Sequence, residues 1–221
     1  MAITYAFDVY GTLIDPLAMG KHLQNLVGDE APKLAQFWRE KQLEYTFRRG
    51  LMSAYVPFDQ VTAEALRYAL AASQITVEEE KQAELLASYR ALEAFSDTTP
   101  ALKNLRAAGN KMWAFSNGTP DDLQALLNSA DVVSLLDGVV SVDEVQSFKP
   151  DPNVYKRFCE RAGSAPEQTC LVSSNPFDII GALNCGWQTA WVQRTTGSIF
   201  DPWQGFTPDR TISSLEELIQ T

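Results

Sequence analysis

A single aspartate in a tight turn offers the clearest chemistry in this sequence. Asp8 follows the short apolar run 3–7, and Tyr10, Gly11 and Thr12 come directly after it. Open α/β sheets bind ligands at the carboxyl ends of their strands, so a carboxylate here is placed to meet a substrate. One carboxylate can act as a nucleophile. A second aspartate at position 10 would favour Mg²⁺ and phosphate chemistry, but that position is Tyr.

Three more groups of polar residues follow later apolar runs. They are Ser116-Asn117, Lys149, and the segment 173–178 that ends in Asp178. Each is weak evidence alone. Ser-Asn-Gly before Pro is an ordinary strand-to-helix turn, an isolated lysine is usually solvated, and an aspartate suits the first turn of a helix. Their order along the chain predicts that all of them converge with Asp8 at one edge of a sheet.

The elements that position these residues alternate between strand and helix. We expect strands over 3–7, 111–115, 139–141, 169–172 and 189–192, with helices between them. Residues from about 17 to 92 show helical patterns and no convincing strand. The sequence therefore predicts an α/β fold with a Rossmann-like parallel sheet and an inserted helical cap subdomain. The expected boundaries are 1–14 and 96–221 for the core and 15–95 for the cap.

Composition excludes several classes of protein. The 221 residues carry a net charge of -10, so no basic surface is available to neutralise nucleic-acid phosphates. No apolar run approaches the ~20 residues of a membrane helix, and no signal peptide is visible. Three cysteines without framework spacing favour a reducing, cytoplasmic setting. With a single histidine, His22, the sequence indicates no metal site and no cofactor.

The polar groups together resemble the four motifs of the haloacid dehalogenase superfamily. The resemblance spans the whole chain and is closest to the L-2-haloacid dehalogenases, which carry Tyr two places after the nucleophile and an arginine in the cap. The matching residues are Asp8-x-Tyr10-Gly11-Thr12-Leu13 for the first motif, Ser116 for the second, Lys149 for the third, Ser173-Ser174-Asn175-x-x-Asp178 for the fourth, and Arg39 in the cap stretch 37–45.

This resemblance implies a metal-independent hydrolysis of 2-haloacids. Asp8 attacks C2 of an (S)-2-haloacid and expels halide, which forms an ester on Asp8. Water then attacks the carbonyl carbon of that ester and releases an (R)-2-hydroxy acid. The ammonium of Lys149 favours the ionised form of Asp8. The implied partner is a small 2-haloacid, without nucleic acid or membrane.

The resemblance also implies roles for the other residues around the nucleophile. Asp178 and Asn175 orient the hydrolytic water and fix Lys149. Thr12, Tyr155 and Ser173 match supporting positions, although a helix N-cap for Thr12 and a core aromatic for Tyr155 explain those two equally well. The expected halide and substrate contacts come from Arg39, Asn117, Phe58, Ser116, Leu43 and Tyr10, with Phe177 where many members carry Trp and Glu40 where many carry Gln.

Other functions stay open at this point. A phosphatase of the same superfamily is the main rival, and Tyr10 argues against it, because an alkoxide leaving group needs a general acid and a halide does not. A non-catalytic protein of this fold is the second, and the intact set of Asp8, Ser116, Lys149 and Asp178 argues against it. A preference for fluorinated acids is the third. The aromatic-rich cap, or the segment 198–203, is compatible with a homodimer.

Overall fold

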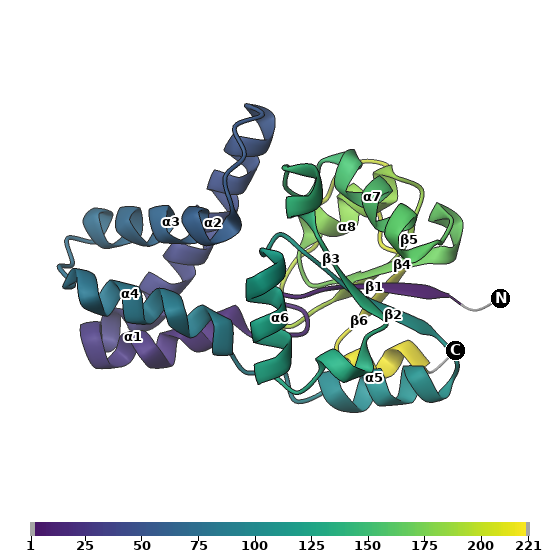
Figure 1. Ribbon diagram of the computed structural model, residues 1–221, viewed down its shortest axis with the longest axis horizontal. Coiled ribbons are helices and arrows are strands. Elements are labelled where there is room, and N and C mark those ends of the chain that lie inside the picture. The colour runs from purple at the N-terminus through teal and green to yellow at the C-terminus, as the bar shows by residue number, and fades with distance from the viewer. Residues whose placement is uncertain (1–2, 220–221) are drawn as a thin grey trace.

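A six-stranded sheet forms the centre of the molecule (Figure 1). The computed structural model describes residues 3–219. All paired strands are parallel, in the order β3-β2-β1-β4-β5-β6. This confirms the predicted α/β class with a parallel sheet. The strands are β1 (Thr4–Asp8), β2 (Lys111–Ser116), β3 (Gly138–Ser141), β4 (Thr169–Ser173), β5 (Gln188–Val192) and β6 (Arg210–Ile212).

Helices cover both faces of this sheet. Helices α7 (Pro152–Ala162) and α8 (Pro176–Asn184) pack together, α8 against β4 and β5, and lie above the sheet in Figure 1. Helices α5 (Thr98–Ala107) and α6 (Pro120–Ser129) lie on the other face and come before β2 and β3 in the chain. Helix α5 also contacts the 3-10 helix η7 (Leu215–Ile219). Residues in β1 and β4 are all buried, as expected for strands covered on two sides.

The elements between β1 and α5 are all helical, and we call them the helical segment. Figure 1 shows them extending to one side of the sheet. Its two connections to the sheet run side by side, because Asp15 N donates to Glu93 O and Phe95 N donates to Leu13 O. Its elements are η1 (Pro16–Ala18), α1 (Met19–Val27), η2 (Gly28–Glu30), α2 (Ala31–Leu51), α3 (Phe58–Ala72), α4 (Glu79–Ser88) and η3 (Tyr89–Ala91).

Among the strands and α-helices, two had no prediction of their own: α1, which lies inside the range 17–92 expected to be helical, and β6. Helix α1 carries four apolar residues, Met19, Leu23, Leu26 and Val27, among Gly, Lys, His and Asn, and only Met19 and Leu23 are buried. Strand β6 has three residues at the sheet edge, too few to show an alternating pattern. Among the described residues, no helix is both long and apolar enough to cross a bilayer. Residues 1–2 and 220–221 of the expected core lie outside the described part of the chain.

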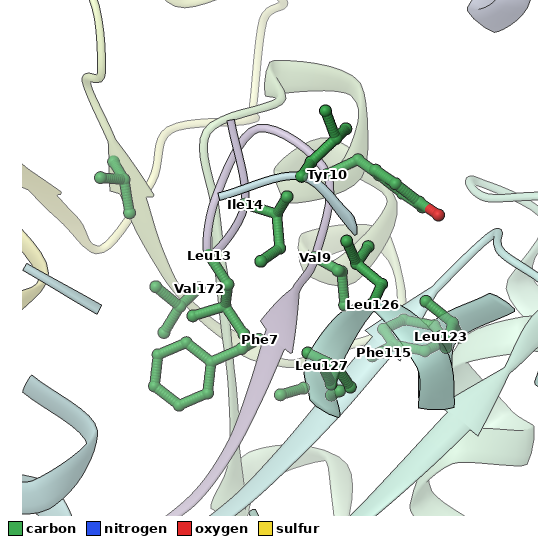
Figure 2. Packing of buried hydrophobic residues seen from close by; sticks show 14 of the residues in the cluster. Phe7, Val9, Tyr10, Leu13, Ile14, Phe115, Leu123, Leu126, Leu127 and Val172 are labelled. Carbon is green, nitrogen blue, oxygen red and sulfur yellow. The ribbon is translucent and has the colours of Figure 1, made fainter. Parts of the chain in front are cut away.

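Apolar packing fixes the turn that follows β1. Val9, Leu13 and Ile14 have no measurable exposure and pack with residues of β2, β4 and α6 (Figure 2). In the same view, the hydroxyl of Tyr10 points away from this cluster. The chain order reverses between β1 and β4, so the carboxyl end of β1 lies at the topological switch point of the sheet. Open α/β sheets bind ligands at this place.

Candidate functional site

Asp8 ends β1 and lies almost buried, with 6% of its surface exposed. One carboxylate oxygen is 3.1 Å from Nζ of Lys149. The other accepts hydrogen bonds from the Thr12 hydroxyl at 3.1 Å, the Ser173 hydroxyl at 3.3 Å and the Asn175 amide at 2.7 Å. Four donors from three stretches of the chain therefore hold this carboxylate in one orientation.

Lys149 is buried, with 1% exposure, and its ammonium has oxygen partners on several sides. Besides Asp8, Nζ donates to Asp178 at 2.7 Å and to the Phe115 carbonyl at 2.9 Å. It also lies 4.1 Å from the centroid of the Phe115 ring. A lysine is rarely buried this fully unless it is paired. One ammonium therefore serves two carboxylates at the centre of the site.

Asp178 and Tyr155 form the layer behind Lys149. Both are fully buried, and the Tyr155 hydroxyl donates to an Asp178 oxygen at 2.8 Å. Burial raises the pKa of the Asp178 carboxyl above its ordinary value, against the effect of the Lys149 charge. Burial likewise raises the pKa of Tyr155 well above its ordinary value, so its hydroxyl stays a donor. Tyr155 is thus a core aromatic and a network member at once.

The turn after Asp8 is tied to the segment after β4. Gly11 has a φ of +92°, a conformation that side chains with a Cβ rarely adopt. The Thr12 hydroxyl accepts from Ser174 N at 2.9 Å, and the Ser174 hydroxyl donates to the Gly11 carbonyl at 2.7 Å. Of the two explanations for Thr12, the contacts favour the one in the Asp8 network, because Thr12 precedes no helix that it could cap.

A small cavity lies against the Asp8 carboxylate, and we call it the closed cavity because it has room for little more than one water molecule. Its volume is about 10 Å³, and it lies between the sheet edge and helices α2, α3 and α8. Four of the residues singled out from the sequence, Thr12, Ser173, Tyr155 and Asp178, lie behind its wall. The other ten line it, and they are Asp8, Tyr10, Arg39, Leu43, Phe58, Ser116, Asn117, Lys149, Asn175 and Phe177.

Arg39 brings a guanidinium from α2 into this cavity. One nitrogen donates to Gln42 at 2.6 Å, and the other is 3.5 Å from the Tyr10 carbonyl. Gln42 is fully buried and donates in turn to the Thr62 hydroxyl of α3. Sequence reasoning missed Gln42. The sequence could have indicated it, because Gln42 is a polar residue three positions after Arg39, and residues three apart lie on the same face of a helix.

The two departures from the family pattern lie in different surroundings. Phe177 lines the cavity and meets Phe47 of α2 edge to face, with 5.0 Å between ring centroids. Glu40 is exposed and accepts a hydrogen bond from Gln36 on the outside of α2. Only Phe177 therefore changes the shape of the site. Within residues 3–219, no three His, Cys, Asp or Glu side chains are grouped to hold a metal ion.

A glycine gives Tyr155 the room to reach Asp178. A Cβ at Gly181 of α8 would lie 2.3 Å from the Tyr155 hydroxyl oxygen and 2.8 Å from Cβ of Pro150. Gly181→Ala is therefore expected to displace the hydroxyl from Asp178 and to lower kcat roughly 10- to 100-fold, as small misplacements in catalytic networks do. Steady-state kinetics on the variant measure this effect.

The matched control for this prediction is Gly50→Ala. Gly50 also lies in a helix, but a Cβ there would meet nothing within 4 Å. Both substitutions favour the helix by about 1 kcal/mol through propensity alone. Loss of activity in Gly181→Ala only, with Tyr155→Phe giving a similar loss, supports the argument. Unchanged kcat in Gly181→Ala would contradict it.

Comparisons with known proteins identify the family of this chain. A model of the haloacid dehalogenase-like hydrolase family matches residues 4–186. A curated relative, (S)-2-haloacid dehalogenase 1 of Pseudomonas sp. (strain CBS-3), is 39% identical over 97% of this chain and 93% of its own length. (S)-2-haloacid dehalogenase 4A of Burkholderia cepacia is 36% identical over 96% of this chain and 91% of its own.

A solved structure is similar over the full length of the chain. It is the L-2-haloacid dehalogenase of Xanthobacter autotrophicus with chloropropionic acid covalently bound. It is 32% identical with a TM-score of 0.90, and the match covers 100% of this chain and 98% of that one. The likeness therefore includes both the sheet and the helical segment.

Proposed function

We propose that this chain, which belongs to the haloacid dehalogenase-like hydrolase family, is an (S)-2-haloacid dehalogenase, a hydrolase of carbon–halide bonds. The supporting observation is one carboxylate, Asp8, held by four donors against a small cavity that is also lined by the guanidinium of Arg39. Relatives bearing that name match nearly the whole chain. The substrate is a small (S)-2-haloacid and the product an (R)-2-hydroxy acid.

The first step in this proposal is a displacement at C2 of the haloacid. An Asp8 oxygen attacks C2 from the side opposite the halide, the C–halide bond breaks with its electron pair, and an ester forms. Arg39 and the Asn117 amide receive the departing anion, with the edge of the Phe58 ring beside them. The substrate carboxylate is held by Ser116 and the turn amides around it.

The second step hydrolyses the ester and restores Asp8. Water attacks the carbonyl carbon, so negative charge develops on the ester's carbonyl oxygen. If the alkylated oxygen is the one facing Lys149, the carbonyl oxygen is the one that accepts from Thr12, Ser173 and Asn175. Donors placed where charge develops stabilise such an intermediate. The bond between the carbonyl carbon and the alkyl oxygen then breaks. One proton of the water goes to that departing oxygen, the other is released to solvent, and the hydroxy acid leaves as the Asp8 carboxylate is restored.

The test is halide release from (S)-2-chloropropionate in the presence of EDTA. We expect one chloride and one proton per (R)-2-hydroxypropionate, with a rate that does not depend on Mg²⁺. In H₂¹⁸O with enzyme in excess, a single turnover should place ¹⁸O in the Asp8 carboxylate. Mg²⁺-dependent release of phosphate from small esters, without halide release from any acid, would overturn the proposal. Fluoroacetate in parallel measures tolerance for the strongest carbon–halide bond.

The helical segment is proposed to act as a cap subdomain over residues 15–95, with 1–14 and 96–221 as the core. The paired connections at Leu13–Asp15 and Glu93–Phe95 support this division. We also propose a cytoplasmic location, supported by three free thiols, which are typical of a reducing compartment.

A homodimer formed through the cap is the last part of this proposal. Leu51 and Met52 are 90% and 67% exposed at the end of α2, and Tyr68 is exposed on α3. Exposed apolar groups of this size often mark protein contacts. Leu51→Glu should convert a dimer into a monomer in analytical ultracentrifugation. Ile199→Glu, equally apolar and exposed but on another face, should leave the dimer intact; the reverse result would place the contact there.

A further inference from the structure

A second cavity adjoins the closed cavity at Asp8. Its volume is about 320 Å³, and it lies where the helical segment meets α6. The closed cavity, at about 10 Å³, holds roughly one water molecule, which is too little for a haloacid. Tyr10 and Phe58 line both cavities. A substrate therefore reaches Asp8 only when a wall moves, and these two rings form the wall that the cavities share.

The two rings are held by ring contacts. Their centroids are 5.7 Å apart, and Tyr10 also lies 6.1 Å from Tyr89. On the neighbouring turn, Gly118 has no Cβ, which would otherwise come within 3.3 Å of the Tyr10 ring. The charges that act on the Tyr10 hydroxyl include Arg39 of the closed cavity, and Arg90 and Asp122 of the second one. The ring thus lies between both spaces.

Charged residues line the outer side of the second cavity. Arg90 of η3 forms an ion pair with Asp122 of α6, with 3.0 Å between Nε and the carboxylate. This pair joins the helical segment to the sheet domain. Asp59 lines the same cavity. For an arriving anion, Arg90 is the attractive group, and Asp122 both repels the anion and occupies the guanidinium.

We propose that this second cavity is the passage by which the 2-haloacid anion reaches Asp8. Tyr10 and Phe58 are its movable wall, and Arg90 receives the carboxylate at its outer end. The proposal rests on the proposed function for the identity of the anion. It assigns Ala63, Arg90 and Asp122 to access, separately from the residues that contact the reacting atoms.

A residue that obstructs a passage changes rates without changing affinity. Ala63 lines the second cavity, and Ala63→Trp would fill it. We expect association and dissociation of (S)-2-fluoropropionate both to slow about tenfold, with Kd unchanged, since the free and bound states stay the same. The measurement is ¹⁹F NMR exchange on the Asp8→Asn background. Ala83→Trp is the control, because Ala83 lines a different cavity between α3 and α4.

A charge variant tests the outer end independently. Asp122→Asn should speed association about threefold at low ionic strength, because it frees Arg90 and removes one repelling charge. This gain should disappear in concentrated salt. Asp121→Asn removes the same charge from the same helix turn at an exposed position, and should change association little.

Three outcomes separate the alternatives. Unchanged rates in Ala63→Trp would mean that the haloacid enters elsewhere, which overturns the passage. Equal effects of Asp121→Asn and Asp122→Asn would show that Arg90 does not receive the anion at the outer end of the passage. No binding of (S)-2-fluoropropionate to the Asp8→Asn parent would overturn the substrate assignment itself, and with it the anion named here.

Discussion

Asp8→Asn is expected to lower kcat about 10⁴-fold or more, as loss of a nucleophile does elsewhere. An amide has no anionic oxygen to attack C2, and it cannot satisfy all the donors that surround Asp8. One of its ends is an NH₂ group, which must face either Lys149 or the cluster of Thr12, Ser173 and Asn175. Chloride release from (S)-2-chloropropionate measures the loss.

The control for this variant is Asp131→Asn. Asp131 is exposed and has a φ of +54°, a left-handed conformation that Asn adopts readily. Asp131→Asn also replaces a carboxylate with an amide, but at a residue outside the site. Full activity in Asp131→Asn together with loss in Asp8→Asn supports the assigned nucleophile. A residual rate above a tenth of wild type in Asp8→Asn would exclude it.

Lys149→Met is expected to lower both activity and stability. Without the ammonium, the buried carboxylates of Asp8 and Asp178 face each other with no cation between them. Removing one partner of a buried pair typically destabilises by about 3–5 kcal/mol. The attacking carboxylate of Asp8 also loses the one cation that holds it in place. We expect kcat to fall about 10³-fold, the scale of a lost electrostatic group in a catalytic site.

The pH dependence distinguishes this explanation from simple unfolding. In Lys149→Met, the buried Asp178 carboxyl loses the positive charge that holds its pKa down, so a larger fraction of it is protonated at neutral pH and the activity that remains should rise toward higher pH. Lys111→Met, at the exposed opposite end of β2, is the control and should keep wild-type kinetics. Thermal unfolding of both variants, followed beside kcat, separates the two effects. A flat pH profile at low activity would contradict the electrostatic argument.

The convergence of the site could be predicted because the chemistry follows strand ends. Asp8, Ser116 and Ser173 close three apolar runs, and the carboxyl ends of parallel strands share one edge. The roles of Lys149 and Arg39 were predicted from the family resemblance, because neither residue directly follows a strand. Lys149 lies well beyond β3, and Arg39 comes from a helix.

Other features had no local signal in the sequence. The hydrogen bond from Ser174 N to Thr12 joins residues 162 positions apart. The room that Gly181 leaves for Tyr155 likewise depends on how α7 and α8 pack. The closed cavity and its neighbour arise from the way the helical segment meets the sheet, which periodicity within one helix does not specify.

The two parallel connections of the helical segment have a consequence for engineering. The chain leaves the sheet domain at Asp15 and returns at Glu93, and these residues are hydrogen-bonded neighbours. An insert with such closely spaced ends can be exchanged as one cassette, since any replacement needs only two adjacent ends. Asp8 and Lys149 would stay in the recipient scaffold, while Arg39 and Phe58 would come with the exchanged helical segment. Chimeras made at these junctions could therefore vary substrate range independently of the chemical step.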